Sequence, residues 1–324
     1  MVENSETKYI GFLQMTDNCL TCGEHFSAES FQFSLGDRRK GLSGIWQLVK
    51  CNNCGVISMV PMPTDEQLAA YYDAYSKDDG VDLTRRTGVH YPRLRKLFHQ
   101  ISGDVDPRDF MDVPVGARVL DYGCGQAGYL CDFHDQGVVI SGAEIAGHLV
   151  DACRNNGLDV HKVDDFSYIP FEDGTFEIVY LMQVFEHLRD PRGFMQELAR
   201  ILKNDGVLYL ILPNAASVWR KIFGKNWVTG WFVPFHLFYY DRPMLAKIAR
   251  EQGFEVVESW SSTPESWFRL NLKAYLYPKE NNLDWRQTWL DALPMRLIIM
   301  IFLRIFELPL HERDCLVMKF LRRK

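Results

Sequence analysis

Four of the eight cysteines occur as two identical pairs, an arrangement typical of a thiolate metal site. The pairs read Cys19-Leu-Thr-Cys22-Gly23 and Cys51-Asn-Asn-Cys54-Gly55. The glycine after each pair lets the backbone turn tightly with its amides facing the sulfurs. Because two such turns close the tetrahedral shell that Zn²⁺ prefers, we predict a structural zinc ion bound by these four thiolates. The alternative is four reduced, buried cysteines.

Two strand-like stretches lie between the cysteine pairs, at 31–35 and 45–50, on either side of the basic turn 36–41. This pattern resembles a zinc ribbon, and we predict that residues 1–62 form one. A unit of this size buries too little surface to be stable alone, so zinc would supply the missing free energy. Arg38-Arg39-Lys40 in the turn is either a solvated loop or a small contact for RNA.

A second group of residues predicts a nucleoside site. Gly123, Gly125 and Gly128 follow a predicted strand and precede a helix, with Cys124 inside the loop and Asp121 just ahead of it. The glycines alone also satisfy the dinucleotide-binding pattern. A carboxylate ahead of the loop would repel a pyrophosphate, which such turns otherwise attract. It suits S-adenosylmethionine, which carries an ammonium and a sulfonium but no phosphate.

Further acids follow the next two predicted strands. Glu144, with Ile145 after it, ends the second strand, where a carboxylate can accept hydrogen bonds from both ribose hydroxyls. Asp164-Asp165-Phe166 follows the third strand, where an acid can contact the adenine amino group and Phe166 can lie beside the ring. The alternative for Glu144 is a solvated strand end.

The segment 116–260 resembles class I S-adenosylmethionine-dependent methyltransferases, through LDYGCGQAG, the strand-end Glu144 and IPFEDGTFEIVYLMQVFEHL. The resemblance implies a Rossmann-like α/β fold with a seven-stranded sheet, helices on both faces and an antiparallel last strand. It also places Gln183 beside the donor. The ribbon followed by PMPTDEQLAAYYDAY is similar to a bacterial subgroup associated with sugar or surface-polysaccharide modification.

Acceptor chemistry requires a group that removes the proton of a hydroxyl. His187 and His236 follow the fourth and fifth predicted strands, and the carboxyl ends of neighbouring parallel strands meet in one crevice. We expect a histidine base there, with Glu186 beside it. Similar O-methyltransferases bind a divalent metal through E-x-x-E-H and a later histidine, but Gln183 replaces the first glutamate here. Metal assistance and a purely structural role for Glu186 and His187 stay as alternatives.

Short β-branched runs alternate with amphipathic stretches from residue 117 onward, which favours a parallel sheet between helices. We predict strands at 118–121, 138–143, 159–163, 177–181, 207–212, 254–259 and 315–321. Residues 63–115 are predicted as a helical connector, with a capping box at Thr64 and Gln67 and a helix over 92–101. Residues 116–324 would form the methyltransferase domain, with a helical insertion at about 261–312.

The insertion contains a helix bounded by Pro294 and Pro309, in which Arg296, Arg304 and Glu307 occupy one narrow sector. We expect its apolar remainder to pack over the active site or a partner subunit; association with a membrane surface is the alternative. Several aromatic residues after the fifth strand are either core or a stacking surface for the acceptor: Trp219, Phe223, Trp227, Trp231, Phe232 and Phe235.

Composition limits the partners. The 324 residues carry 36 Lys and Arg against 42 Asp and Glu, and a net charge of −6 does not favour a broad nucleic-acid surface. The N-terminal stretch lacks the pattern of a secretory signal, and no apolar run reaches the roughly 20 residues that a membrane span needs, so we expect a cytoplasmic protein. The oligomeric state is left open.

The sequence thus predicts methyl transfer from S-adenosylmethionine to a small acceptor, with a sugar hydroxyl of a nucleotide sugar or glycan as the first candidate. Two rivals remain at this point. The glycine pattern also fits an NAD-linked oxidoreductase. A non-catalytic module, in which the ribbon recruits a partner and the second domain senses the donor, is the other.

Overall fold

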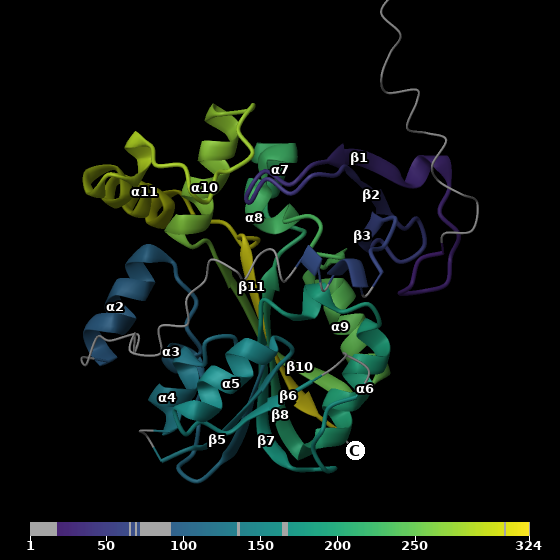
Figure 1. Cartoon of the computed structure of the whole chain (residues 1–324), viewed down its shortest axis with the longest axis vertical. Helices are drawn as coiled ribbons and strands as arrows, with labels where there is room; N and C mark the ends of the chain where they lie inside the picture. The colour runs from purple at the N-terminus through teal and green to yellow at the C-terminus, as the bar shows by residue number, and fades with distance from the viewer. Residues whose placement is uncertain are drawn as a thin grey trace, which may run out of the picture.

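The β-branched runs form one seven-stranded sheet in the order β10-β11-β8-β7-β4-β5-β6 (Figure 1). It is seen in a computed structural model, which describes residues 18–64, 66–68, 70–71, 92–134, 137–163, 168–307 and 309–323. Its strands are β4 (Arg118–Tyr122), β5 (Val139–Glu144), β6 (Val160–Lys162), β7 (Phe176–Met182), β8 (Leu202–Pro213), β10 (Phe254–Ser262) and β11 (Cys315–Arg322). All seven predicted strands are confirmed, and β11 runs antiparallel to both its neighbours.

Helices cover both faces of this sheet because successive strand residues point to opposite sides. In β4, Leu120 packs into the core shared with α6 and α9, whereas Val119 packs into the core shared with α4 and α5. These helices are α4 (Gly128–His134), α5 (Gly147–Asn155), α6 (Pro191–Ile201) and α9 (Arg242–Glu251). Asp190 and Asp241 cap α6 and α9 by accepting hydrogen bonds from the amides of Gly193 and Met244. The predicted fold class is therefore confirmed.

A second, smaller sheet has the strand order β1-β2-β3-β9. The hairpin predicted between the cysteine pairs is present as β1 (Phe31–Leu35), which follows the short helix η3 (Ala28–Ser30), and β2 (Trp46–Lys50). The other two strands, β3 (Ile57–Val60) and β9 (Phe238–Tyr239), are additional to those predicted from the sequence. Because β9 lies between α8 and α9 in the chain, the small sheet joins the N-terminal segment to the large domain.

The connector is described only in part. Gln67 and Thr64 exchange the two hydrogen bonds of the predicted capping box, at 2.9 and 3.2 Å. The predicted helix at 92–101 is α2 (Pro92–Ser102), and the short α3 (Pro107–Phe110) follows it.

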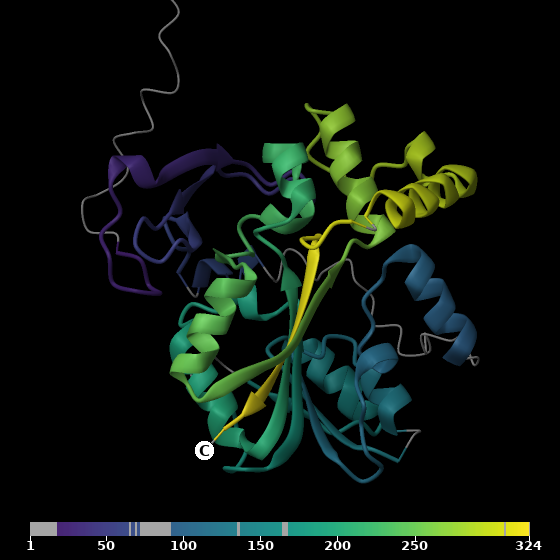
Figure 2. The same ribbon diagram turned by 180° about the vertical axis from the view of Figure 1, so that it is seen from behind.

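A group of helices lies beyond the carboxyl ends of the parallel strands (Figures 1 and 2). They are η4 (Phe185–His187), α7 (Val218–Phe223), η5 (Gly224–Asn226), α8 (Val228–Trp231), α10 (Glu265–Leu276), η6 (Trp289–Asp291) and α11 (Leu293–Phe306). Within the described chain, no helix combines the length and apolar character needed to cross a membrane.

The aromatic residues after β8 are core. Trp219, Phe223, Trp227, Trp231 and Phe235 are all buried, and Trp219 and Phe223 both contact Phe268 of α10 edge to face. Only Phe232 of the predicted set is partly exposed. The interpretation as a stacking surface for an acceptor is therefore wrong for the five buried rings, because each is already covered by protein.

Candidate active site at the carboxyl edge of the sheet

The glycine loop after β4 is held against β5. The amides of Gly123 and Cys124 both donate to the carbonyl of Ala143, at 2.8 and 3.1 Å. Gly123 has φ +78°, and a Cβ there would lie 2.4 Å from Cγ2 of Val184, so only glycine fits. Gly125 also has a positive φ, +52°, but no described atom lies within 4 Å of the position of its Cβ. The loop therefore leaves room for a ligand at Gly125.

Two buried carboxylates flank this loop, as the spacing of Asp121 and Glu144 predicts. Burial raises the pKa of Asp121 to about 7, and its Oδ2 has no hydrogen-bond partner among the described residues. Glu144 Oε2 accepts from the amide of Gly125 at 2.8 Å, and Oε1 accepts from the amides of Ile145 and Ala146, both at 2.9 Å. Since a carboxylate offers about four acceptor positions, Glu144 retains capacity for a ligand hydroxyl.

The other residues predicted to bind the methyl donor lie in different environments. Cys124 is buried, and a Cβ on Gly142 would lie 2.7 Å from its sulfur, so this side chain points into the core. Gly128 begins α4. Gln183 directly follows β7 and has φ +57°, and its side-chain nitrogen donates to the carbonyl oxygen of Ile211 at 3.4 Å. Asp164, Asp165 and Phe166 lie outside the described residues.

Glu186, His187 and His236 converge beside the glycine loop. Glu186 Oε1 lies 3.7 Å from Nε2 of His236 and 4.0 Å from Nε2 of His187. The two imidazole rings have centroids 4.8 Å apart and are nearly perpendicular, at 87°. Val184, in the same turn, touches Gly123 of the glycine loop. The two groups of candidate residues therefore adjoin at the ends of the neighbouring strands β4 and β7.

Burial determines the charge state of this cluster. It raises the pKa of Glu186 to about 8, and it lowers the pKa of His187 to about 4 and that of His236 well below its usual value. His236 Nδ1 lies 2.7 Å from the carbonyl oxygen of Gly230, which can only accept, so Nδ1 carries the hydrogen. His236 therefore presents the lone pair of Nε2 toward Glu186. Neither carboxylate oxygen of Glu186 has a hydrogen-bond partner in the part of the chain described here.

Backbone pairing assembles the cluster from distant segments. The amide of Leu237, next to His236, donates to the carbonyl of Glu186 at 2.9 Å, and the carbonyl of Leu237 accepts from the amide of Met59 in β3 at 3.0 Å. The hydroxyl of Tyr239 in β9 lies 2.7 Å from the carbonyl oxygen of Trp231. Local sequence patterns do not predict this link; its one signal is the short strand-like run Ile57–Val60 (ISMV) after the second cysteine pair.

The four cysteines predicted as metal ligands come together. Sγ of Cys19 lies 3.6 Å from Sγ of Cys54, Sγ of Cys22 lies 3.5 Å from Sγ of Cys51, and all four sulfurs lie within 4.8 Å of one another. A tetrahedral zinc site with bonds of about 2.3 Å has sulfur–sulfur edges of about 3.8 Å. Both following glycines have φ +79°, which gives the two turns the same shape. This geometry fits a zinc ion.

The basic turn between β1 and β2 is not a free cationic patch. Arg38 donates to Asn226 Oδ1 at 2.7 Å and to the carbonyl of Tyr277 at 2.6 Å. Arg39 pairs with Asp284 at 3.1 Å and stacks on the ring of Phe232. Both interpretations from the sequence, a solvated loop and an RNA contact, are therefore wrong for these arginines, because their charges bind the large domain.

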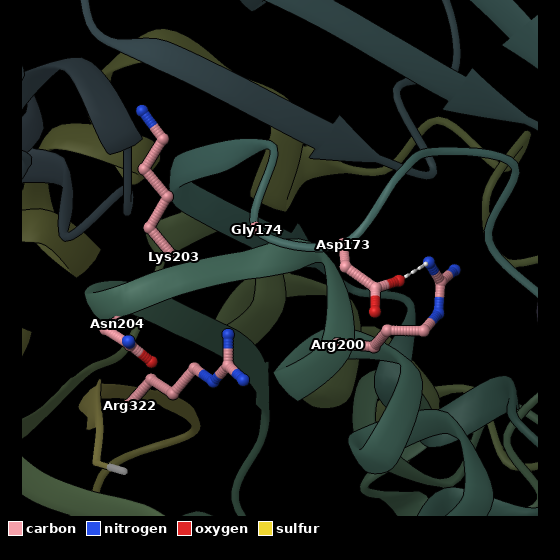
Figure 3. Close-up of a pocket in the computed structure, with 6 residues that line it drawn as sticks. All are labelled: Asp173, Gly174, Arg200, Lys203, Asn204 and Arg322. Carbon is pink, nitrogen blue, oxygen red and sulfur yellow. Dashed lines mark hydrogen bonds and ion pairs between the residues drawn. The ribbon is translucent and has the colours of Figure 1, made fainter.

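A pocket of about 520 Å³ lies at the opposite edge of the sheet (Figure 3). It is lined by Asp173, Gly174, Arg200, Lys203, Asn204 and Arg322. Two of its three cations form ion pairs within the protein: Arg200 pairs with Asp173 at 2.9 Å, and Lys203 pairs with Glu177. The third, Arg322, donates a hydrogen bond to the carbonyl of Leu202. Because ligands of parallel α/β sheets bind at the carboxyl ends of the strands, this pocket is separate from the candidate site.

Comparison with known proteins agrees with this architecture. The model of a family described as "Methyltransferase domain" matches residues 91–259. A ubiquinone biosynthesis O-methyltransferase of Xanthomonas oryzae is 35% identical over 107 residues, which cover 31% of this chain and 44% of that protein. The sterol 24-C-methyltransferase erg6 of Schizosaccharomyces pombe is 33% identical over 105 residues, or 30% of this chain and 28% of that protein.

Among solved structures, a SAM-dependent methyltransferase from Archaeoglobus fulgidus covers 78% of this chain and 99% of its own, with a TM-score of 0.46 and 17% identity. The matched segment spans less than half of each of the two curated relatives named above. The family match itself covers the sheet from β4 into β10, together with the glycine loop and the histidine cluster. The chain therefore belongs to the methyltransferase-domain family, and its fold is that of the class I S-adenosylmethionine-dependent methyltransferases.

Proposed function

We propose that the protein transfers a methyl group from S-adenosylmethionine to a hydroxyl of a small acceptor. The observation that carries this proposal is the position of Glu186, His187 and His236 beside the glycine loop, with Val184 in contact with Gly123. Methyl transfer from a sulfonium is an in-line displacement, so catalysis depends on holding donor and acceptor together. Adjacent donor and acceptor sites provide that arrangement.

The donor would bind at the loop after β4. The open side of Gly125 admits the nucleoside, Glu144 accepts from its ribose hydroxyls, and the buried carboxyl of Asp121 faces its cationic end. Acids on both sides of the loop favour a cationic nucleoside over a dinucleotide, since a pyrophosphate would be repelled. Both this electrostatic argument and the family match favour methyl transfer over an NAD-linked reaction or donor sensing alone.

The acceptor hydroxyl would lie against the histidine cluster. Neutral imidazole nitrogens suit both a general base and a metal ligand. Two histidines and a carboxylate whose ligand atoms lie within 4.8 Å also fit a divalent cation, and the unpartnered oxygens of Glu186 support that fit. When bound, such a cation would lower the pKa of the acceptor hydroxyl. The hydrogen bond from His236 Nδ1 to Gly230 would keep Nε2 directed at the acceptor in either case.

A sugar hydroxyl remains our first candidate acceptor, as a nucleotide sugar or glycan, and the ribbon's likeness to the sugar-associated subgroup supports it. The buried aromatic residues after β8 add nothing to this choice. The name of the Xanthomonas oryzae relative, an O-methyltransferase, supports transfer to an oxygen atom. We add phenolic hydroxyls to the set of acceptors to be tested. We also propose a structural zinc ion bound by the four cysteines. The chain would then consist of a zinc ribbon at 1–62, a connector at 63–115 and the methyltransferase domain at 116–324.

The test separates donor binding from turnover. His187→Ala and His236→Ala should each abolish methyl transfer from labelled donor to a panel of sugar and phenolic acceptors, while the dissociation constant for S-adenosylhomocysteine changes by less than about threefold. His311→Ala, an exposed histidine in the segment after α11, is the matched control and should keep full activity. Equal loss of donor binding and turnover in either variant would contradict the assigned role.

A further inference from the structure

Helix α11 is apolar on its outward side as well as on the side that packs on the protein, where Ile299, Met300 and Leu303 are buried. Its two cations face the protein: Arg296 lies 3.4 Å from Glu265 Oε2, and Arg304 donates to the carbonyl of Thr263 at 3.1 Å and lies 3.3 Å from Glu307 Oε2. The charged sector recognised in the sequence therefore lies at the edge of the packed side, where the two arginines are partly exposed. The expectation that the apolar remainder packs over the active site is wrong, because most of that remainder is exposed in the described chain.

The outward side of α11 is continuously apolar. Leu293, Leu297, Ile301 and Ile305 form one row at four-residue spacing, with exposures of 66, 47, 58 and 66%. Ile298, Phe302 and Phe306 form a second row beside it and are also exposed. Trp289, one turn before Leu293, is 56% exposed. A contiguous apolar surface of this kind on a soluble domain marks an interaction site.

Helix α2 extends this surface. It lies beside α11 in both views (Figures 1 and 2), and Arg304 donates to the carbonyl of Gln100 at 3.5 Å, which joins the two helices. Four apolar residues of α2 are exposed, and so are two cations: Leu94, Leu97, Phe98, Ile101, Arg93 and Lys96. Neither helix contains an acidic residue. We call the exposed sides of these two helices the α2–α11 face.

We propose that the α2–α11 face docks on the surface of a bilayer that contains anionic lipid. An interfacial helix lies in the membrane plane with Leu, Ile and Phe inserted, cations near the headgroups and Trp at the boundary, which is the composition of this face. Fourteen residues of α11 are too few to span the hydrocarbon core, so the helix would lie flat. A second copy is the poorer occupant, because an interface between two such faces would remove Arg93 and Lys96 from water without an acid on either helix to pair with them.

Vesicle flotation of the full chain tests this proposal. We expect the wild type to bind phosphatidylcholine vesicles about tenfold more tightly when they contain phosphatidylglycerol. The double variant Ile298→Glu and Ile301→Glu should lose at least about a hundredfold in binding. Lys96→Glu should remove most of the preference for phosphatidylglycerol. Val139→Glu places one such charge on a similarly exposed apolar residue at the opposite edge of the sheet and should bind as the wild type does, whereas Ile301→Glu alone should already weaken binding.

A second measurement does not depend on whether the double variant folds. Vesicles with brominated acyl chains should quench part of the tryptophan emission of the wild type, and Trp289→Phe should remove that part. Failure of the wild type to float with anionic vesicles, or equal flotation of the double variant, would overturn the proposal. So would light scattering that shows a dimer of the wild type and a monomer of the double variant, since a second copy would then occupy the face.

Discussion

The amide of Met59 donates a hydrogen bond to the carbonyl of Leu237 at 3.0 Å, although 178 positions separate the two residues in the chain. Met59 belongs to β3, which directly follows the second cysteine pair, and Leu237 is the neighbour of His236. Leu237 in turn donates to the carbonyl of Glu186. The cysteine cluster and the histidine cluster are therefore ends of one hydrogen-bonded backbone network.

Loss of the metal site should consequently impair turnover more than donor binding. In Cys51→Ala, one of four thiolates is missing, so β3 loses the support of the cysteine turns and the segment at Leu237 loosens. We expect the zinc content to fall from one ion per chain, kcat/KM to fall at least about tenfold, and the affinity for S-adenosylhomocysteine to change little. Metal analysis, kinetics and calorimetry measure these three quantities.

Cys153→Ala is the matched control for this prediction, because Cys153 is buried in α5 outside the cluster. It should keep its zinc, and it controls for the metal content alone, because its thiol lies 3.9 Å from the carbonyl oxygen of Gly125 in the glycine loop. Full activity of a zinc-free Cys51→Ala protein would show that the ribbon does not support the site.

Local patterns predict the elements of this protein well, because each depends on neighbouring residues. The cysteine pairs, the capping box at Thr64 and the strand before the glycine loop are all recognisable within ten residues. Strand β9 is not, since its two residues form a strand only by pairing with β3. The orientation of α11 cannot be predicted for the same reason: Thr263 and Glu265, which bind its arginines, lie about thirty to forty positions earlier, between β10 and the start of α10. The unpartnered state of Glu186 likewise depends on segments that only the fold brings together.

Asp121 should make donor binding depend on pH. Its pKa is raised to about 7 by burial, so the carboxyl is neutral below that pH and negative above it. The affinity for cationic S-adenosylmethionine should therefore increase as the pH rises from about 6 to about 8, by at most about tenfold per unit below 7. Asp121→Asn should bind more weakly at pH 8 and lose most of this dependence. Calorimetry at several pH values measures this dependence. If the affinity of the variant changed with pH as that of the wild type does, the role of Asp121 would be refuted.

Glu186 should destabilise the folded protein. Both of its oxygens are buried and lack hydrogen-bond partners in the described structure, and a buried polar group in that state costs about 1–3 kcal/mol. Glu186→Leu should therefore raise the free energy of unfolding by about that amount in urea titrations without added divalent cation, and it should be inactive. Added Mn²⁺ should stabilise the wild type but not the variant. A variant less stable than the wild type would show that Glu186 has a structural role instead.

Asp314 should make the folded protein less stable as the pH rises, which is the opposite of the effect of most acidic residues. It is fully buried, and burial raises its pKa to about 7, although Ser217 and Trp227 donate hydrogen bonds to it. The folded state therefore keeps a proton that the unfolded chain releases near its ordinary pKa of 3.8. This contribution to stability is complete below about pH 4 and is lost as the pH rises through about 7, by up to about 4 kcal/mol. Asp314→Asn holds a neutral side chain at every pH. As the pH rises from about 4 to about 8, the variant should therefore become more stable relative to the wild type, as measured by the free energy of unfolding. A difference that stays constant over this range would show that Asp314 has the same pKa in the folded and the unfolded state.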